Sequence, residues 1–130
     1  LTMSPPLSFN PKWVKDYLAY SISKQGMTMC TIGIAQRHKD TTLHVNSLWP
    51  KTTIATAAVE VNLPPQVYQA SRKPDIVADA AYSILTDHSE DNTGQSYIDE
   101  NRLKEKEGIT DFTPYALNPD IPSFQDIFID

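Results

Sequence analysis

The sequence is poor in cysteine and glycine, and it contains neither a basic cluster nor a long apolar run. Cys30 is the only cysteine among the 130 residues, which excludes an internal disulfide and suits a reducing, intracellular compartment. The net charge is −5 and the 11 basic residues are scattered, which argues against nucleic acid or an anionic membrane surface as a partner. No apolar run approaches the roughly 20 residues of a membrane span. A chain of this length can bury one core, so it is one domain or part of one.

Glycine and histidine are also arranged in ways that exclude two kinds of site. The four glycines lie at positions 26, 33, 94 and 108, so they never form the Gly-rich loop that binds a dinucleotide. The three histidines have no ligand-like spacing with each other or with Cys30, so we expect no metal site. We expect Cys30 to be a buried thiol, and the acidic pairs Glu90-Asp91 and Asp99-Glu100 to be solvated loop charge.

Helical and strand patterns alternate along the chain. Asn10 followed by Pro11 is a typical helix start, because a capping side chain precedes a residue with a suitable fixed backbone angle. The patterns predict helices at 12–38, at 56–61 and from Pro74 to Leu85, and strands at 1–4, 43–49 and 95–98. Glycines 26 and 33 within the first helix indicate close backbone packing, and three later prolines predict an irregular arm at the end. This order of elements favours an α/β sheet.

Tyr20 and Lys24 are the residues whose spacing points to chemistry. Because they are four residues apart on a predicted helix, their side chains share one face, one turn from each other. An ammonium beside a phenol lowers the phenol pKa from about 10 towards the working range of a general acid or base. The pair alone is weak evidence and favours an ordinary amphipathic helix that buries the tyrosine and exposes the lysine.

Further segments follow this pair in an order that is typical of one enzyme family. They run from Leu43 to Pro50, from Ile54 to Thr56 and from Thr93 to Asp99. Together with Tyr20 to Lys24 they resemble the second half of a short-chain dehydrogenase/reductase. The resemblance implies an α/β fold that is the C-terminal half of a doubly wound, Rossmann-like parallel sheet, with the N-terminal dinucleotide-binding half missing. It implies that residues 1–102 form the catalytic half of that domain and that residues 103–130 are its C-terminal extension.

The resemblance also implies roles for three polar side chains. Tyr20 would be the catalytic acid/base, and Lys24 would lower the pKa of its phenol and hold the ribose hydroxyls of NAD or NADP. Ser4, at the end of the first predicted strand, would orient the substrate carbonyl as the third catalytic group. Ser8 lies nearer the family's usual spacing from the tyrosine, but it falls in a predicted loop.

The segment after the strand 43–49 matches the part of the family that holds the nicotinamide carboxamide. The resemblance implies that Pro50, Ile54 and Thr56 bind the cofactor there, although Lys51 stands where the family usually has glycine. Residues 57–70 correspond to the substrate lid, in which Leu63 and Val67 would present an apolar lining to the substrate.

The function implied by the resemblance is hydride transfer between a nicotinamide cofactor and an alcohol or carbonyl, in an NAD(P)-dependent oxidoreductase competent only with the missing half. Segments such as Ser4 to Leu7 and Trp49 to Thr52 are similar to a subfamily in which a sterol-carrier domain follows. That similarity implies lipid-related substrates and a peroxisomal or mitochondrial setting. We expect a homo-oligomer formed through the Tyr20 helix. The alternative is a non-catalytic structural or remnant subunit packed into a larger assembly.

Overall fold

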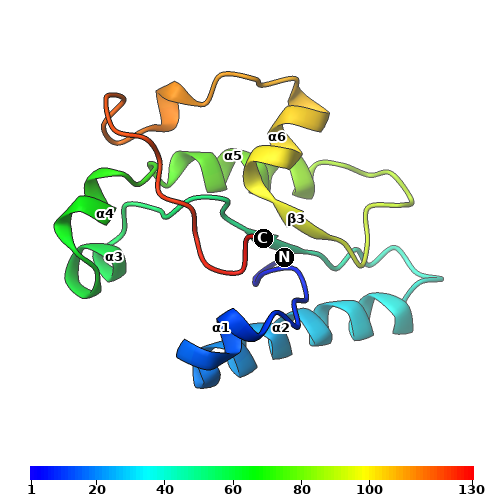
Figure 1. Cartoon of the computed structure of the whole chain (residues 1–130). Helices are drawn as coiled ribbons and strands as arrows, with labels where there is room; N and C mark the ends of the chain where they lie inside the picture. Colours follow the sequence, from blue (N-terminus) through cyan, green and yellow to red (C-terminus); the bar gives the residue numbers. More distant parts are fainter.

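The computed structural model describes residues 1–130, in which helices and strands alternate (Figure 1). The elements in chain order are β1 (Thr2–Met3), α1 (Pro11–Asp16), α2 (Leu18–Arg37), β2 (Ser47–Trp49), α3 (Ala57–Asn62), α4 (Pro65–Gln69), α5 (Asp75–Leu85), β3 (Ser96–Ile98), α6 (Asp99–Glu107) and the 3₁₀ turn η1 (Thr113–Tyr115). None of the helices combines the length and the apolar character that crossing a membrane requires.

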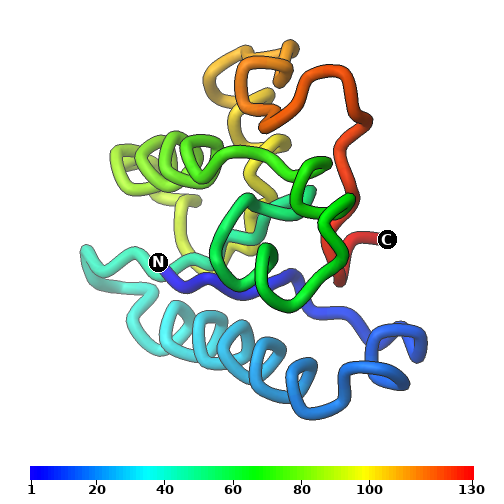
Figure 2. The backbone as a smooth tube through the Cα atoms, turned by 90° about the vertical axis from the view of Figure 1, so that its left-hand side faces the viewer, coloured from blue at the N-terminus to red at the C-terminus, as the bar shows by residue number.

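The three strands form one parallel sheet in the order β1-β2-β3. Ser47 of β2 is in register with Thr2 on one side and Ser96 on the other. Helix α2 lies on one side of the sheet, and α5 and α6 lie on the other (Figures 1 and 2). The predicted α/β class is therefore confirmed, as a partial, Rossmann-like parallel sheet covered by helices.

The core lies between the central strand and the helices α5 and α6. Its fully or almost fully buried side chains are Leu48, Ile76, Ala80, Ile84 and Leu103. The three residues from α5 recur every four positions, so they form one helix face, as the sequence pattern predicts. The apolar pattern of this helix also predicts that Leu85 is buried, but its side chain is 64% exposed because it lies one residue, or about 100° of helix rotation, beyond Ile84.

The single helix predicted over residues 12–38 is divided in two at Tyr17, whose backbone angles of φ −133° and ψ 39° are not helical. Helix α2 turns a face of small and hydroxyl side chains towards the sheet, namely Ser21, Thr28, Thr31 and Ala35. Cys30 does not share that face and is exposed, so the prediction of a buried thiol is wrong. The close packing predicted at glycines 26 and 33 is also wrong, since nothing lies within 4 Å of a Cβ built at either position.

Helix α6 replaces part of the predicted irregular arm. Asp99 opens this helix and is 0% exposed, and Glu100 is 8% exposed, so the prediction that this pair is solvated loop charge is wrong. Glu100 forms salt bridges with Arg72 and Lys51. The helix ends at Gly108, whose φ of 70° is left-handed and suits glycine at a helix C-terminus.

The chain end returns to the carboxyl end of β2. Gln125 forms an antiparallel bridge with Thr52, and the indole nitrogen of Trp49 donates a hydrogen bond of 3.0 Å to the carbonyl oxygen of Ile127. Phe128 is 4% exposed and its ring contacts three other aromatic rings, those of Trp13, Tyr20 and Trp49. The C-terminal residues are thereby fixed against both the sheet and the helix α2.

Candidate active site

A cleft of about 940 Å³ opens at the carboxyl ends of β1 and β2. Met3 is the last residue of β1, Trp49 is the last residue of β2 and Pro50 follows it, so all three lie at the same edge of the parallel sheet and all three line the cleft. Open α/β sheets bind their ligands at this edge. Most of the other lining residues are apolar and come from α3, α5 and the loop before α3.

Tyr20 and Lys24 from α2 line this cleft together. The ammonium of Lys24 donates a hydrogen bond of 3.0 Å to the carbonyl oxygen of Met3, which ties the side chain to the end of β1. It lies 5.8 Å from the ring centroid of Tyr20 and 5.4 Å from that of Trp49. The pair therefore faces the cleft from one helix face, with the lysine directed towards the sheet.

The pKa of the Tyr20 phenol is raised above its ordinary value of 10.0. Partial burial is the main cause, and the negative charge of Asp126 adds to it. This direction is opposite to the lowering predicted from the neighbouring lysine, because burial and the charge of Asp126 both disfavour the ionised phenol. Near neutral pH the phenol of this chain is protonated.

Four further residues predicted from the sequence line the cleft, namely Pro50, Ile54, Thr56 and Leu63. The strand-like segment around Ile54 pairs with Arg72, and the backbone N–H of Ala55 donates to the Arg72 carbonyl at 2.8 Å. Thr56 caps α3, with its hydroxyl accepting a hydrogen bond from the N–H of Val59. Val67, the second predicted lid residue, is half-buried in α4 and is not part of the lining.

Neither candidate serine reaches the cleft. Ser4 is 0% exposed, and its hydroxyl lies 3.4 Å from that of Thr2. The hydroxyl of Ser8 accepts a hydrogen bond from the N–H of Asn10 and lies 3.4 Å from the carboxylate of Asp130, near the chain end. The structure thus brings together Tyr20 and Lys24 but not the third predicted catalytic group.

Asp126 is a cleft residue that the sequence patterns missed. It comes from the C-terminal arm, about 100 residues from Tyr20, and no local motif marks it. Burial raises the pKa of its carboxyl to about 6, with a smaller contribution from the charge of Asp99. Only the return of the chain end to β2 places this acid beside Tyr20 and Lys24.

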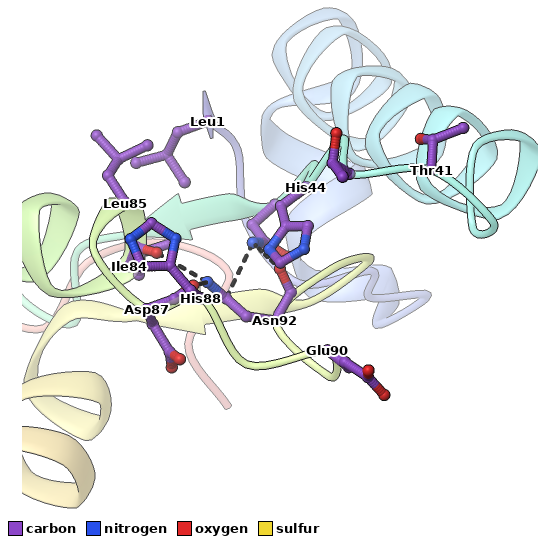
Figure 3. A pocket seen from close by; sticks show the side chains of 11 residues that line it. Leu1, Thr41, His44, Ile84, Leu85, Asp87, His88, Glu90 and Asn92 are labelled. Atoms are coloured by element: carbon purple, nitrogen blue, oxygen red, sulfur yellow. Dashed lines mark hydrogen bonds between the residues drawn. The ribbon is translucent and has the colours of Figure 1, made fainter.

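A second pocket of about 560 Å³ lies at the opposite edge of the sheet (Figure 3). Leu1, Asn46 and Asn92 line it, each preceding one of the three strands. The side-chain amide of Asn46 donates to the carbonyl and side-chain oxygens of Asn92, which ties two strand starts together. His44 and His88 also line the pocket, yet no three potential metal ligands gather anywhere in the chain. The predicted catalytic residues Tyr20 and Lys24 lie at the other edge of the sheet, in the cleft at the carboxyl ends of the strands.

Two solved structures share this fold over almost the whole chain. One, from a protein of Xanthomonas campestris provisionally classed as a dehydrogenase, gives a TM-score of 0.89 at 36% identity, covering 99% of this chain and 47% of that one. The other, a short-chain dehydrogenase of Mycobacterium thermoresistibile, gives 0.85 at 38% identity, covering 99% and 45%. The fold thus matches part of these dehydrogenase chains, which confirms the resemblance found in the motifs.

The chain is also similar to curated relatives that share a single name. Hydroxysteroid dehydrogenase-like protein 2 from Xenopus laevis and from Homo sapiens are each 48% identical to this chain over 130 residues. The match covers 100% of the chain but only 30% of either relative, so the chain spans about a third of their length. The subfamily that the segments Ser4 to Leu7 and Trp49 to Thr52 resemble is that of hydroxysteroid dehydrogenase-like protein 2. No protein-family model matches the chain.

Proposed function

We propose that this chain supplies the catalytic cleft of an NAD(P)-dependent oxidoreductase that transfers a hydride between a nicotinamide cofactor and an alcohol or carbonyl. The observation that carries the proposal is the joint position of Tyr20 and Lys24 in a cleft at the carboxyl ends of parallel strands. The similarity to short-chain dehydrogenases supports it.

Tyr20 is proposed to move the proton. Its hydroxyl bonds to no other group of this chain, so it is free to donate to the oxygen of a carbonyl that gains a hydride. The raised pKa keeps the proton on the phenol near neutral pH, so the phenol is in the protonated form that the reductive direction requires. In the oxidative direction the same phenol has to lose its proton first, so that direction gains rate as pH rises.

Lys24 is proposed to hold the cofactor. An ammonium has three N–H donors, and the Met3 carbonyl uses one of them, which leaves others for the ribose hydroxyls. Pro50, Ile54 and Thr56 line the cleft where the family holds the carboxamide, and the Thr56 hydroxyl, which accepts from the Val59 N–H, still has its own proton to donate there. The cofactor, when bound, supplies or accepts the hydride, and the side chains orient the two reactants.

The substrate is proposed to be lipid-like. The cleft wall includes Val59 and Leu63 from the lid segment and Val77 and Ala81 from α5. Buried apolar area gives non-directional affinity for alkyl or ring systems, and it gives little for a sugar. We also propose a homo-oligomer formed through α2, on which Ile22 and Met29 are 66% and 64% exposed.

The test uses the full-length protein that contains this chain. Wild type should oxidise NADH or NADPH in the presence of medium-chain ketones or aldehydes, and Lys24→Ala should weaken cofactor binding at least tenfold because a charge-assisted hydrogen bond is lost. Lys15→Ala, an exposed lysine of α1 outside the cleft, is the matched control.

Cofactor binding is measured by titration of nicotinamide fluorescence and turnover by absorbance. Equal cofactor affinity in Lys24→Ala and wild type would remove the assigned role of the lysine. Absence of both turnover and cofactor binding in wild type would instead support a non-catalytic subunit.

A further inference from the structure

The cleft contains one acidic and one basic side chain among its lining residues. Asp126 is the acid and Lys24 is the base, and the remaining lining residues are neutral. The two charges come from opposite ends of the sequence, one from α2 and the other from the C-terminal segment. A carboxylate in a mostly apolar cleft is costly to bury, so its presence requires a physical explanation.

Backbone contacts hold Asp126 in this position. Its N–H donates to the Lys51 carbonyl at 3.0 Å, and the following residue is fixed by the bond from the Trp49 indole to the Ile127 carbonyl. One carboxylate oxygen, Oδ1, accepts a hydrogen bond of 2.7 Å from the N–H of Ile127. The other, Oδ2, bonds to no group of this chain, so it is a free acceptor at the cleft wall.

The charged and titratable groups around Asp126 explain why the acid stays partly uncompensated. Asp99 at the start of α6 adds a second negative charge, and the Tyr20 phenol on α2 faces the same cleft. The Lys24 ammonium bonds to the Met3 carbonyl and forms no salt bridge with Asp126. A second negative charge close to Asp126 would therefore meet repulsion from a carboxylate that no direct ion pair neutralises.

We infer that Asp126 is a specificity-determining residue that rejects substrates carrying an anionic group near the reacting carbon and selects neutral, mainly apolar alcohols and ketones. The inference rests on the proposed function for the identity of the reacting carbon. Its physical basis is like-charge repulsion at a partly desolvated site, where the attenuation by water is weak. The free Oδ2 also accepts a hydrogen bond from a substrate hydroxyl, which an anionic carboxylate cannot donate.

The test compares two substrates of the full-length protein: methyl levulinate, a neutral ketone, and levulinate, the corresponding keto acid. At about pH 7.5 the carboxyl group of levulinate is ionised. Wild type should favour the ester by roughly tenfold or more in kcat/KM, because like charges are opposed in the complex with the acid. Asp126→Asn should narrow the ratio to about twofold, mainly through a lower KM for levulinate. Asp120→Asn, an exposed acid of the same arm outside the cleft, is the matched control and should retain the wild-type ratio.

A binding measurement keeps this inference separate from the proposed function. Calorimetric titration with 1-octanol and with octanoate, in wild type and Asp126→Asn, reports charge selection even in a protein that turns over neither ketone. Weaker binding of octanoate that is relieved in the variant supports the inference, whatever the turnover. Equal handling of ester and acid by wild type, or an unchanged preference in Asp126→Asn in both measurements, overturns it.

Discussion

Asp99 lies at the first turn of α6 with its side chain completely buried. Its Oδ1 accepts hydrogen bonds from the N–H groups of Lys51 and Glu100, at 2.9 and 2.7 Å, while Oδ2 is buried without a partner. Burial raises the pKa of this carboxyl from 3.8 to about 6. Asp99→Asn keeps the two accepted hydrogen bonds and removes the buried charge, so we predict that it stabilises the protein at neutral pH.

The magnitude follows from linkage between proton binding and folding. A folded-state pKa of about 6 against 3.8 unfolded means that, between these pH values, the folded state binds more protons than the unfolded state. Stability from this group is therefore fully present below pH 3.8 and falls as pH rises through about 6. Relative to a side chain that stays neutral at every pH, Asp99 lowers the free energy of unfolding by about 3 kcal/mol at pH 7 and by about 1 kcal/mol at pH 4.5. The new amide N–H₂ is left without a partner at about 1 kcal/mol, so the net gain is about 2 kcal/mol at pH 7 and near zero at pH 4.5.

The assay is urea unfolding of wild type and Asp99→Asn at both pH values, with Asp120→Asn as an exposed control. The variant should have the higher midpoint at pH 7 and an unchanged one at pH 4.5. A variant that is less stable than wild type at pH 7, or equally shifted at both pH values, would show that the buried charge of Asp99 does not destabilise the folded protein.

Two further predictions concern the buried arginine and the lid. Arg102 is 3% exposed and donates hydrogen bonds to the Ser83 hydroxyl, to the Ser83 carbonyl and to Asp87. Arg102→Met should therefore lower the free energy of unfolding by about 3 kcal/mol, measured by urea titration. The exposed control Lys104→Met should lower it by less than about 0.5 kcal/mol. An effect as small as that of Lys104→Met would contradict a structural role for the network. Leu63→Ser should reduce kcat/KM severalfold for long-chain ketones and leave short ones unchanged, and an equal loss for all chain lengths would exclude Leu63 from the substrate wall.

The sequence predicts the elements whose side-chain pattern has one dominant period. The fourfold spacing of Ile76, Ala80 and Ile84 predicts both the helix α5 and its buried face. Helix α6 has no such pattern, because Leu103 is its one apolar residue, and the helix is held by propensity and by buried polar contacts. Its good helix formers, followed by Gly108, are a signal that periodicity alone overlooks.

The residues of the candidate site also differ in whether the sequence predicts their position. Tyr20 and Lys24 are joined by local helix geometry, so their shared face can be predicted from a spacing of four residues. Asp126 reaches the cleft only through backbone pairing of the chain end with Lys51 and Thr52, and no local pattern contains that information. Partial burial of the phenol, with the charge of this non-local carboxylate added, raises its pKa, and the spacing of Tyr20 and Lys24 contains neither effect.

The proposed role of Tyr20 as the proton donor is tested by the turnover of Tyr20→Phe in the full-length protein, with cofactor affinity measured in parallel. This change removes the hydroxyl that is proposed to donate the proton and retains the ring that stacks on Phe128, with centroids 6.1 Å apart. We predict that kcat falls by roughly a hundredfold or more while the cofactor Kd changes by less than about threefold. Near-normal turnover in Tyr20→Phe would contradict it.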